Sequence, residues 1–519
     1  MAMTDTAAQA EPGPGPGDGA PGPIGARGPG WAVLVVCCLA QFMVVLDVSI
    51  VNVAMPSMQS ELGLSPSGLQ WVANAYTLAF AGLLLFGGRA GDLFGRRLVL
   101  IVGLVLFTGA SLVGGLSQGP ATLILARAAQ GVGAAVLTPA TLSLLTTSFT
   151  EARERARAIG LWGATAAGGG ACGAFIGGVL TDLANWRWVL FVNVPIGVLL
   201  LVGARTVLAE SRGQVSRLRD LDVPGTLLVT AGLGVLVFGI VHAENHPWGS
   251  AGTAGCLAGG AVLLAAFVAV EARGANPLVP LSIFRMRALA VANVVVLFLG
   301  AATFALFYFL TLFLQDVRGM SPLAGGTALL VIPVMIITGS QIASRLVGRV
   351  GARPLILAGS LVGTAGFGWL TQISADGSYW TQVLGPGLLI GLGAGTNMVA
   401  TTSAATTGVP GRLAGLASGL VNTGRQMGAA IGLAVLTTVA ASRTASLRSH
   451  GVAGPVALTS GYARGIAVAA GLMVAAGLLA LALPRRAATP RVVVTPSVDT
   501  ASLDTPSAAA DATLAAEAG

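Results

Sequence analysis

The sequence predicts an all-α protein that crosses a membrane many times. Apolar residues make up 54% of the 519 residues and only 9% are charged, whereas an average soluble protein is roughly 25% charged. The 28 basic and 20 acidic residues are too few to cover the roughly three or four soluble domains that this length would otherwise suggest. Runs of about 20 apolar residues, long enough to cross the hydrocarbon layer as helices, recur along the chain. Lipid is therefore the expected solvent.

The composition excludes several classes of protein. All 28 basic residues are arginine, so the lysine that a Walker A loop, a Schiff-base enzyme or a protein kinase requires is missing. The four cysteines lie inside apolar runs without a CxxC pair, which indicates neither a zinc site nor a disulfide framework. His242 and His246 are interpreted as part of a polar loop, because Pro247 follows and no third metal ligand is near. We expect no metal and no cofactor.

The helices follow in order between two tails. Residues 1–30 contain Pro-Gly repeats and cannot bury enough apolar surface to become ordered, and residues 485–519 are expected to be a second disordered tail. The run from Trp31 to Met55 is too long and starts too late for a cleaved signal peptide, so it is the first helix. Fourteen helices are predicted, with starts near residues 31, 69, 98, 121, 158, 186, 223, 251, 288, 324, 354, 381, 414 and 460.

The positions of the arginines test this count, because cytoplasmic loops carry the excess of basic residues. With the N-terminus inside, 21 arginines fall in inner segments, whereas the outer loops hold Arg187, Arg318, Arg443 and Arg448. The net charge of +8 therefore reflects topology and indicates no nucleic-acid partner. The composition of the chain is typical of GC-rich bacterial genomes. Together with the arginine distribution it predicts a multi-pass protein of the bacterial cell membrane with both termini cytoplasmic.

A weak internal repeat divides the chain. Gly95 to Leu100, after the second predicted helix, resembles Gly351 to Ile356, after the tenth, at an offset of 256 residues. The offset exceeds the length of six helices, so two helices are interpreted as an insertion. Parallel halves of this kind place a substrate site near the middle of the membrane. The predicted parts are a six-helix half (31–208), two inserted transmembrane helices with linker loops (209–284) and a second six-helix half (285–484).

Asp47 is an acidic residue well inside an apolar span, where a carboxylate costs roughly 2.5–3.5 kcal/mol by insertion scales. Counted from the outer ends of their helices, Asp47 lies about 12 Å deep and Arg127, in the fourth helix, about 9 Å deep. We therefore expect the two side chains to share a layer and to face one central cavity. Asp47 could gain and lose a proton as a coupling group. The alternatives are a permanently paired acid and an arginine that reaches out through the lipid.

Two predicted helices carry polar stripes, and a third carries regularly spaced glycines. The stripes indicate either hydrogen bonds between helices or the lining of a polar cavity. Phe304, Phe307 and Tyr308 form an aromatic patch that faces either lipid or a ligand. Glycines at intervals of four allow close helix packing. The candidate cavity residues are Gln70, Asn74, Thr77, Ser418, Asn422, Arg425 and Gln426, and the fifth-helix glycines are Gly160, Gly169, Gly173, Gly177 and Gly178.

The motifs around these residues resemble those of the fourteen-helix drug:proton antiporters of the major facilitator superfamily, of the EmrB/QacA type. Leu46 to Pro56 resembles the family's first-helix motif, whose Asp is implicated in proton coupling. Arg127 to Gly133 is similar to the fourth-helix motif, whose Arg is linked to proton transfer, and Trp186 to Gly197 resembles a signature of the subgroup. The motif that latches the cytoplasmic gate in the family is represented by Gly88, Gly91, Asp92, Gly95, Arg96 and Arg97.

Two positions depart from the family's motifs. The fifth-helix antiporter motif contains Gly-Pro-x-x-Gly-Gly, but Ala174 stands in place of the proline while the glycines remain. We expect the helix packing to persist with a weaker kink. In the second half, Gly348 occupies the position that Asp92 has in the first half, so only one of the two gate motifs carries the acid.

The resemblance implies a major facilitator fold and proton-coupled efflux of hydrophobic or amphiphilic drug-like compounds by alternating access, as in a multidrug or antibiotic resistance exporter. The expected partners are the lipid bilayer, a small-molecule substrate and protons, and the expected state is a monomer driven by the proton gradient without a cofactor. With one membrane acid, a neutral or monocationic substrate is favoured over a dicationic one. A proton-coupled metabolite transporter and a membrane-embedded enzyme are the alternatives; the enzyme is disfavoured because no catalytic constellation lies at a helix end.

Overall fold

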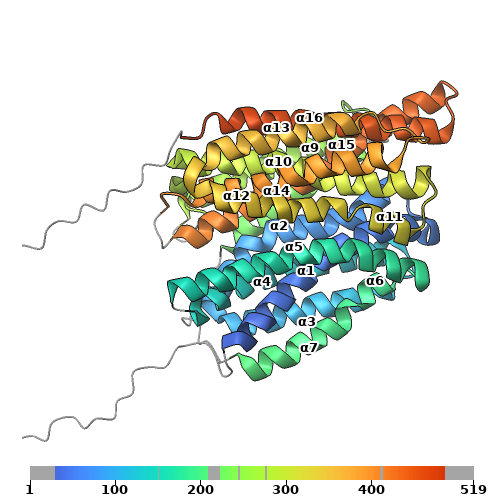
Figure 1. The fold of residues 1–519 in the computed structure, drawn as a ribbon. Coiled ribbons are helices and arrows are strands. Elements are labelled where there is room, and N and C mark those ends of the chain that lie inside the picture. The colour runs from blue at the N-terminus through green and yellow to red at the C-terminus, as the bar shows by residue number, and fades with distance from the viewer. Residues whose placement is uncertain are drawn as a thin grey trace, which may run out of the picture. The chain divides into compact units, whose positions relative to one another are not determined.

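The structure is a computed structural model, shown in Figure 1, that describes residues 30–149, 151–208, 222–243, 246–274, 277–409 and 413–484. The two predicted tails lie outside these residues, apart from Gly30, as do several of the inner-loop arginines. The described residues form helices and short connections. The helices are α1 (Gly30–Leu62), α2 (Pro66–Phe94), α3 (Arg96–Gly115), α4 (Pro120–Ser148), α5 (Ala152–Leu183), α6 (Trp188–Phe191), α7 (Asn193–Val207), α8 (Val223–His242), α9 (Ala251–Arg273), η2 (Leu281–Arg285), α10 (Arg287–Leu312), η3 (Phe313–Val317), α11 (Pro322–Ala328), α12 (Val331–Val350), α13 (Ala352–Leu370), η4 (Trp380–Leu384), α14 (Gly385–Thr406), α15 (Ala414–Ser449) and α16 (Gly454–Ala480).

The helix starts follow from local capping chemistry. The side chains of Ser65, Asp222, Ser250 and Ser321 accept hydrogen bonds from backbone N–H groups in the first turns of α2, α8, α9 and α11. Such a cap satisfies one of the donors that a helix start leaves unpaired. Helix α16 begins at Gly454, earlier than the predicted 460, because Pro455 occupies the first turn, where a helix tolerates proline.

The predicted all-α fold with fourteen crossings is confirmed. Thirteen helical segments of the described residues are long and apolar enough to cross a membrane. Some of these combine two elements, such as α6 with α7 and α11 with α12. Helix α13, 19 residues long, packs against α14 and α16 and makes the fourteenth crossing. The start of α1 and the end of α16 lie at the same end of the bundle in Figure 1, as an even number of crossings requires.

The helices form two groups that meet along the bundle. In the first group α1 packs against α5, and α4 packs against α2 and α3. In the second group α10 packs against α15 and α16, while α14 packs against α12 and α13. The first group, blue to cyan, lies below the second, yellow to red, in Figure 1. The groups contact each other mainly through α2 with α15 and through α5 with α11.

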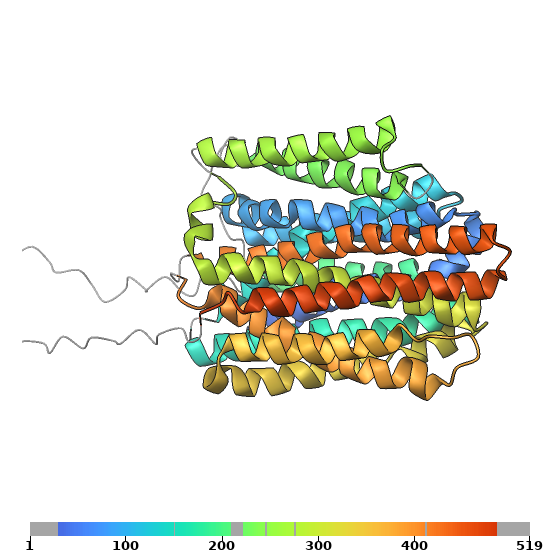
Figure 2. The ribbon, with the colours of Figure 1, turned by 90° about the horizontal axis from the view of Figure 1, so that it is seen from above.

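Helices α8 and α9 form a hairpin on one side of the bundle, seen at the top of Figure 2. Helix α8 contacts both groups. A Cβ atom added to Gly82 of α2 would lie 2.4 Å from the hydroxyl of Thr230 in α8. On the other side, the Thr438 hydroxyl of α15 donates a 3.2 Å hydrogen bond to the carbonyl of Ile240 in α8. The hairpin therefore covers the line along which α2 meets α15.

The glycines of α5 let this helix approach α1 closely. A Cβ atom at Gly173 would lie 2.6 Å from the Cβ of Ser49, and one at Gly177 would lie 2.9 Å from the carbonyl oxygen of Ile50. Gly169 makes the same kind of contact one turn away. Gly160 lies apart from this contact, because a Cβ atom there would meet nothing within 4 Å. The packing function thus belongs to the later glycines of the predicted motif.

We expect Gly173→Ala to destabilise the protein by about 1–3 kcal/mol, the usual cost of overpacking a tight contact. Gly160→Ala is the matched control on the same helix. It should be neutral or stabilise by up to about 1 kcal/mol, because alanine has the better helix propensity and no atom obstructs it. Thermal unfolding in detergent measures both. Equal effects of the two substitutions would show that the α1–α5 contact is looser than described.

Candidate functional site

Asp47 lies inside α1 and is fully buried. Three side chains donate hydrogen bonds to its carboxylate. Arg127 Nη1 lies 2.5 Å from Oδ2, and Gln130 Nε2 and Asn193 Nδ2 lie 3.0 Å and 2.9 Å from Oδ1. Arg127 and Gln130 come from α4 and Asn193 from the first position of α7. The charge of the carboxylate is therefore compensated by an ion pair and two amide donors, as a buried charge requires.

Arg127 is held by contacts with three helices. Its Nε donates to the carbonyl of Val72 in α2 at 3.3 Å, and its Nη1 also donates to Gln130 Oε1 at 3.0 Å. Its guanidinium carbon lies 4.4 Å from the ring centroid of Tyr76, close enough for a cation–π interaction. The Tyr76 hydroxyl in turn donates to the carbonyl of Val44 in α1 at 3.4 Å. These contacts fix the guanidinium beside the carboxylate without lipid exposure.

Ser111 of α3 connects the two amide side chains to the backbone of α6. Its hydroxyl accepts hydrogen bonds from Gln130 Nε2 at 3.0 Å and Asn193 Nδ2 at 3.1 Å, and donates to the carbonyl of Leu190 in α6 at 2.8 Å. None of the side chains involved is more than 2% exposed. We call these residues the buried polar cluster: Asp47, Tyr76, Ser111, Arg127, Gln130 and Asn193.

The prediction that Asp47 and Arg127 lie together is confirmed, since their side chains form an ion pair at 2.5 Å. The expectation that both face a central cavity is wrong for this conformation, because they are 0% and 2% exposed. Donors from α4 and α7 and the Tyr76 ring from α2 enclose them. Gln130 and Asn193, the amide partners of Asp47, were not predicted as site residues. Gln130 could have been inferred from its i+3 position on the same helix face as Arg127, and Asn193 from its polar side chain next to an apolar run.

The two predicted polar stripes differ in their surroundings. On α2, Gln70, Asn74 and Thr77 are no more than 2% exposed, so this stripe is buried between helices. Thr77 donates to the carbonyl of Ala73, and neither polar side-chain atom of Asn74 has a hydrogen-bond partner among the described residues. On α15 the polar side chains stay half-buried, and these are Ser418, Asn422, Arg425 and Gln426. In the aromatic patch, Phe304 and Phe307 are half-buried and Tyr308 is buried.

Arg425 lies where α15 crosses α10 at close range. A Cβ atom at Gly300, near the middle of α10, would lie 2.3 Å from the carbonyl oxygen of Arg425. Arg425 is about 16 Å from the start of α15, counted at 1.5 Å per residue. In the described part of the chain its guanidinium makes no ion pair with an acid. An arginine at this depth is costly unless it faces a polar partner or water.

The gate motif lies at the turn between α2 and α3. Gly95 separates the two helices with φ +96°, and Gly351 separates α12 from α13 with φ +85°. The matching conformations at an offset of 256 residues, 351 minus 95, support the internal repeat.

The other residues of the gate motif lie on either side of this turn. Arg97 Nη2 donates to the carbonyl of Arg205 at 2.9 Å, which ties the start of α3 to the end of α7. Gly88 and Gly91 lie in α2 and Arg96 opens α3; the side chain of Asp92 lies outside the described part.

The two helix groups touch at the end of the bundle away from the gate motif. A Cβ atom at Gly178 of α5 would lie 2.7 Å from the Cα of Leu323 in α11. Nearby, Gln315 Nε2 of η3 donates to the carbonyl of Val53 in α1 at 2.9 Å. Ala174, which replaces the motif's proline, is buried, and its carbonyl oxygen lies against Gly326 of α11. The fifth-helix motif therefore forms part of the contact between the groups.

A family model described as Major Facilitator Superfamily matches residues 37–433. The chain belongs to the major facilitator superfamily. Among curated superfamily relatives, the cephamycin export protein CmcT of Amycolatopsis lactamdurans is 46% identical over 425 residues, covering 80% of this chain and 87% of the relative. The puromycin resistance protein pur8 of Streptomyces alboniger is 43% identical over 443 residues, with coverage of 85% and 87%. The multidrug resistance protein Stp of Mycobacterium tuberculosis is 38% identical over 420 residues, with coverage of 80% and 77%.

Solved structures of other transporters share the fold. An auto-inhibited POT family peptide transporter superposes with a TM-score of 0.62 at 15% identity, covering 86% of this chain and 96% of that one. A D-xylose-proton symporter superposes with a TM-score of 0.60 at 14% identity, covering 85% and 97%. The family match and the relatives named for antibiotic export and for multidrug resistance confirm the resemblance to the drug exporters of the superfamily. Membership indicates a multi-pass membrane transporter rather than an enzyme.

Replacing Arg127 by Gln should destabilise this transporter by about 3–5 kcal/mol, because it leaves the Asp47 carboxylate buried without a counter-charge. Neutralising both residues, in Asp47→Asn with Arg127→Gln, should recover much of that loss. Thermal unfolding in detergent of the two single variants and the double variant gives the coupling free energy. Additive effects of the two substitutions would contradict a direct charge interaction between these side chains.

Proposed function

We propose that the protein exports hydrophobic or amphiphilic drug-like compounds in exchange for protons, by alternating access. The observation that carries the proposal is the Asp47–Arg127 ion pair, buried inside a membrane-spanning helix bundle. Relatives at 38–46% identity are named as antibiotic export and multidrug resistance proteins. A membrane carboxylate supplies a proton-binding group, and the relatives point to efflux of drug-like compounds.

The buried polar cluster suits an acid that changes protonation state. Each donor to the Asp47 carboxylate other than Arg127 is an amide, and an amide carries a donor at one end and an acceptor at the other. Rotation of the Asn193 amide would turn this donor into an acceptor for a protonated acid. Asn193 Oδ1 has no hydrogen-bond partner in the described part of the chain. Arg127 would keep Gln130 Oε1 and the Val72 carbonyl as acceptors when Asp47 is neutral.

The route from the acid to the contact between the helix groups runs through α1 and α5. Ser49, two residues after Asp47, donates a 2.7 Å hydrogen bond to the carbonyl of Gly170 in α5. Helix α5 in turn touches α11 of the other group through Gly178. Loss of the ion pair on protonation would therefore loosen α1 from α4 and shift α5 against α11. Asp92, Arg96 and Arg97 would latch the opposite end in the alternate state.

The half-buried polar side chains of α15 are the proposed substrate contacts. Arg425 is the charged member of this stripe, and it disfavours a cationic compound at the same place. Because of this positive charge we expect neutral or anionic amphiphiles as substrates, rather than the neutral or monocationic compounds that the sequence alone favoured. Asn422 and Gln426 offer both hydrogen-bond donors and acceptors beside it. The buried stripe of α2 is assigned to helix packing instead.

Asp47→Asn should abolish uphill, proton-driven efflux while exchange of substrate across the membrane at equal concentrations continues. The amide fills similar space but cannot carry a proton, and each proton contributes about 2.3 kcal/mol per 100 mV. Everted vesicles with an imposed pH gradient measure both activities. Asp182→Asn, an exposed acid near the end of α5, is the matched control and should transport normally. Retained uphill transport in Asp47→Asn would overturn proton coupling at this residue.

Arg425→Gln should raise the KM for an anionic amphiphile about tenfold to a hundredfold, the equivalent of about 1.5–3 kcal/mol for a lost charged hydrogen bond. The KM for a neutral compound should change little. Arg425→Lys keeps the charge and serves as the control. Efflux of an anionic and a neutral fluorescent dye from vesicles gives the comparison. An equal rise for both dyes would indicate a structural function of Arg425.

A further inference from the structure

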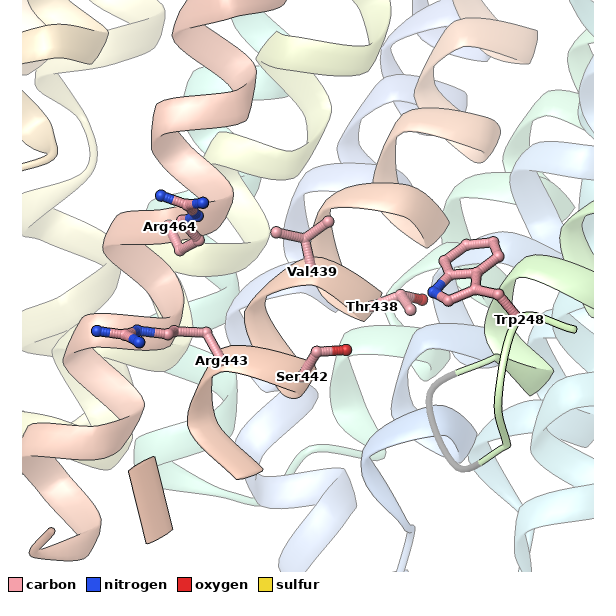
Figure 3. Close-up of a pocket in the computed structure, with 6 residues that line it drawn as sticks. All are labelled: Trp248, Thr438, Val439, Ser442, Arg443 and Arg464. Atoms are coloured by element: carbon pink, nitrogen blue, oxygen red, sulfur yellow. The ribbon is translucent and has the colours of Figure 1, made fainter. Parts of the chain in front are cut away.

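A basic pocket opens at the end of the bundle where α15 turns into α16, shown in Figure 3. Its volume is about 350 Å³. A second hollow of about 400 Å³ shares Arg443 and Arg464 with the first and adds Ser460. In Figure 3 the two arginines lie on one side of the pocket and Trp248 lies on the other. The lining residues of the first hollow are Trp248, Thr438, Val439, Ser442, Arg443 and Arg464.

Neither arginine of this pocket is neutralised by the described part of the chain. The ion pairs found there join Asp47 to Arg127 and Glu61 to Arg187. Arg443 and Arg464 are both exposed, and two like charges that line the same hollows repel each other. An anion between them would remove this repulsion and satisfy several donors at once.

Counting along the helices places the pocket near the boundary between the hydrocarbon layer and the lipid headgroups. Arg464 is about 15 Å from the start of α16, and Arg443 is about 9 Å from the end of α15, at 1.5 Å per residue. Helix α15 is 36 residues long, or about 54 Å, so its ends project beyond a hydrocarbon layer about 30 Å thick. Helical side chains tilt towards the start of their own helix, so the two arginines reach towards each other from antiparallel helices. Trp248 has the side chain that is enriched at this membrane interface.

The surface that continues from the pocket along α16 is apolar. Ala467, Gly471, Val474 and Leu478 follow Arg464 on one helix face at spacings of three and four, and all are exposed. Val474 and Leu478 are 44% and 62% exposed. A soluble anion would gain nothing from this face. A molecule with an anionic headgroup and a hydrocarbon chain would contact both parts.

We propose that Arg443 and Arg464 bind the phosphate group of an anionic phospholipid, with its acyl chain along the exposed face of α16. Ser460 lines the second hollow together with both arginines and adds a hydroxyl that can donate to a phosphate oxygen, whereas the Ser442 hydroxyl points away from the Arg443 guanidinium in Figure 3. The lipid would also lie beside Trp248, which precedes α9. It would therefore join the α8–α9 hairpin to α15 and α16 at this end of the bundle. The proposal is independent of the transported substrate.

Native mass spectrometry of the full-length protein in detergent tests the site. The probes are phosphatidylglycerol, zwitterionic phosphatidylcholine and inorganic phosphate, each titrated separately. We expect phosphatidylglycerol to bind more tightly than either of the others. The double variant Arg443→Ala with Arg464→Ala should weaken phosphatidylglycerol binding about thirtyfold, the equivalent of about 1 kcal/mol for each arginine.

Two control variants separate the site from general charge and from misfolding. Arg448→Ala removes the same charge from the exposed end of α15 and should leave binding unchanged. Arg443→Lys with Arg464→Lys keeps both charges and should retain most of the binding, while an unchanged unfolding temperature shows that each variant is folded. Unaltered phosphatidylglycerol binding by the alanine double variant would overturn the proposal. Inorganic phosphate that binds as tightly as phosphatidylglycerol would also overturn it in favour of a soluble-anion site.

Discussion

The compensation of one buried carboxylate organises the N-terminal helix group. Asp47 has no access to water, so every bond that its oxygens need must come from neighbouring helices. Arg127 and Gln130 draw α4 to it, and Asn193 draws α7. Each of these partners is itself bonded to a further helix, through Val72, Tyr76 or Ser111. Removing Arg127 would leave Asp47 Oδ2 without a partner, whereas Gln130 and Asn193 share Oδ1. The residues of the cluster come from five helices and so hold these helices together.

The helix that carries the acid is also packed closely against α5 by backbone contact. Glycines of α5 lie against the turns of α1 on either side of Asp47, and the Ser49 hydroxyl bonds to the α5 backbone there. A displacement of α1 would therefore shift α5 by a similar amount, because no flexible side chain lies between the two backbones to absorb the movement. Because α1 carries the ion pair on one face and packs against the α5 backbone on the other, a displacement of α1 would move α5 with it.

Depth could be predicted from the sequence, but orientation could not. An α-helix has a fixed rise per residue, so counting from the helix ends placed Asp47 and Arg127 in one layer, and they form an ion pair. Which way a polar side chain faces depends on how the helices are rotated against each other. The stripes of α2 and α15 show the same spacing, yet Asn74 is 0% exposed while Arg425 is half-buried. Asn193 of α7 and Ser111 of α3 also belong to the site, but the spacing of residues within one helix does not predict which other helices pack against it.

The placement of α8 makes the two seams between the helix groups unequal. Helix α8 contacts α2 at Gly82 and α15 at Thr438, so it seals the seam between these helices from the lipid. The opposite seam, where α5 meets α11, has no such cover from the hairpin. The inserted helices therefore make the bundle asymmetric towards the membrane around it, because the α8–α9 hairpin covers one of the two seams between the helix groups and leaves the other uncovered.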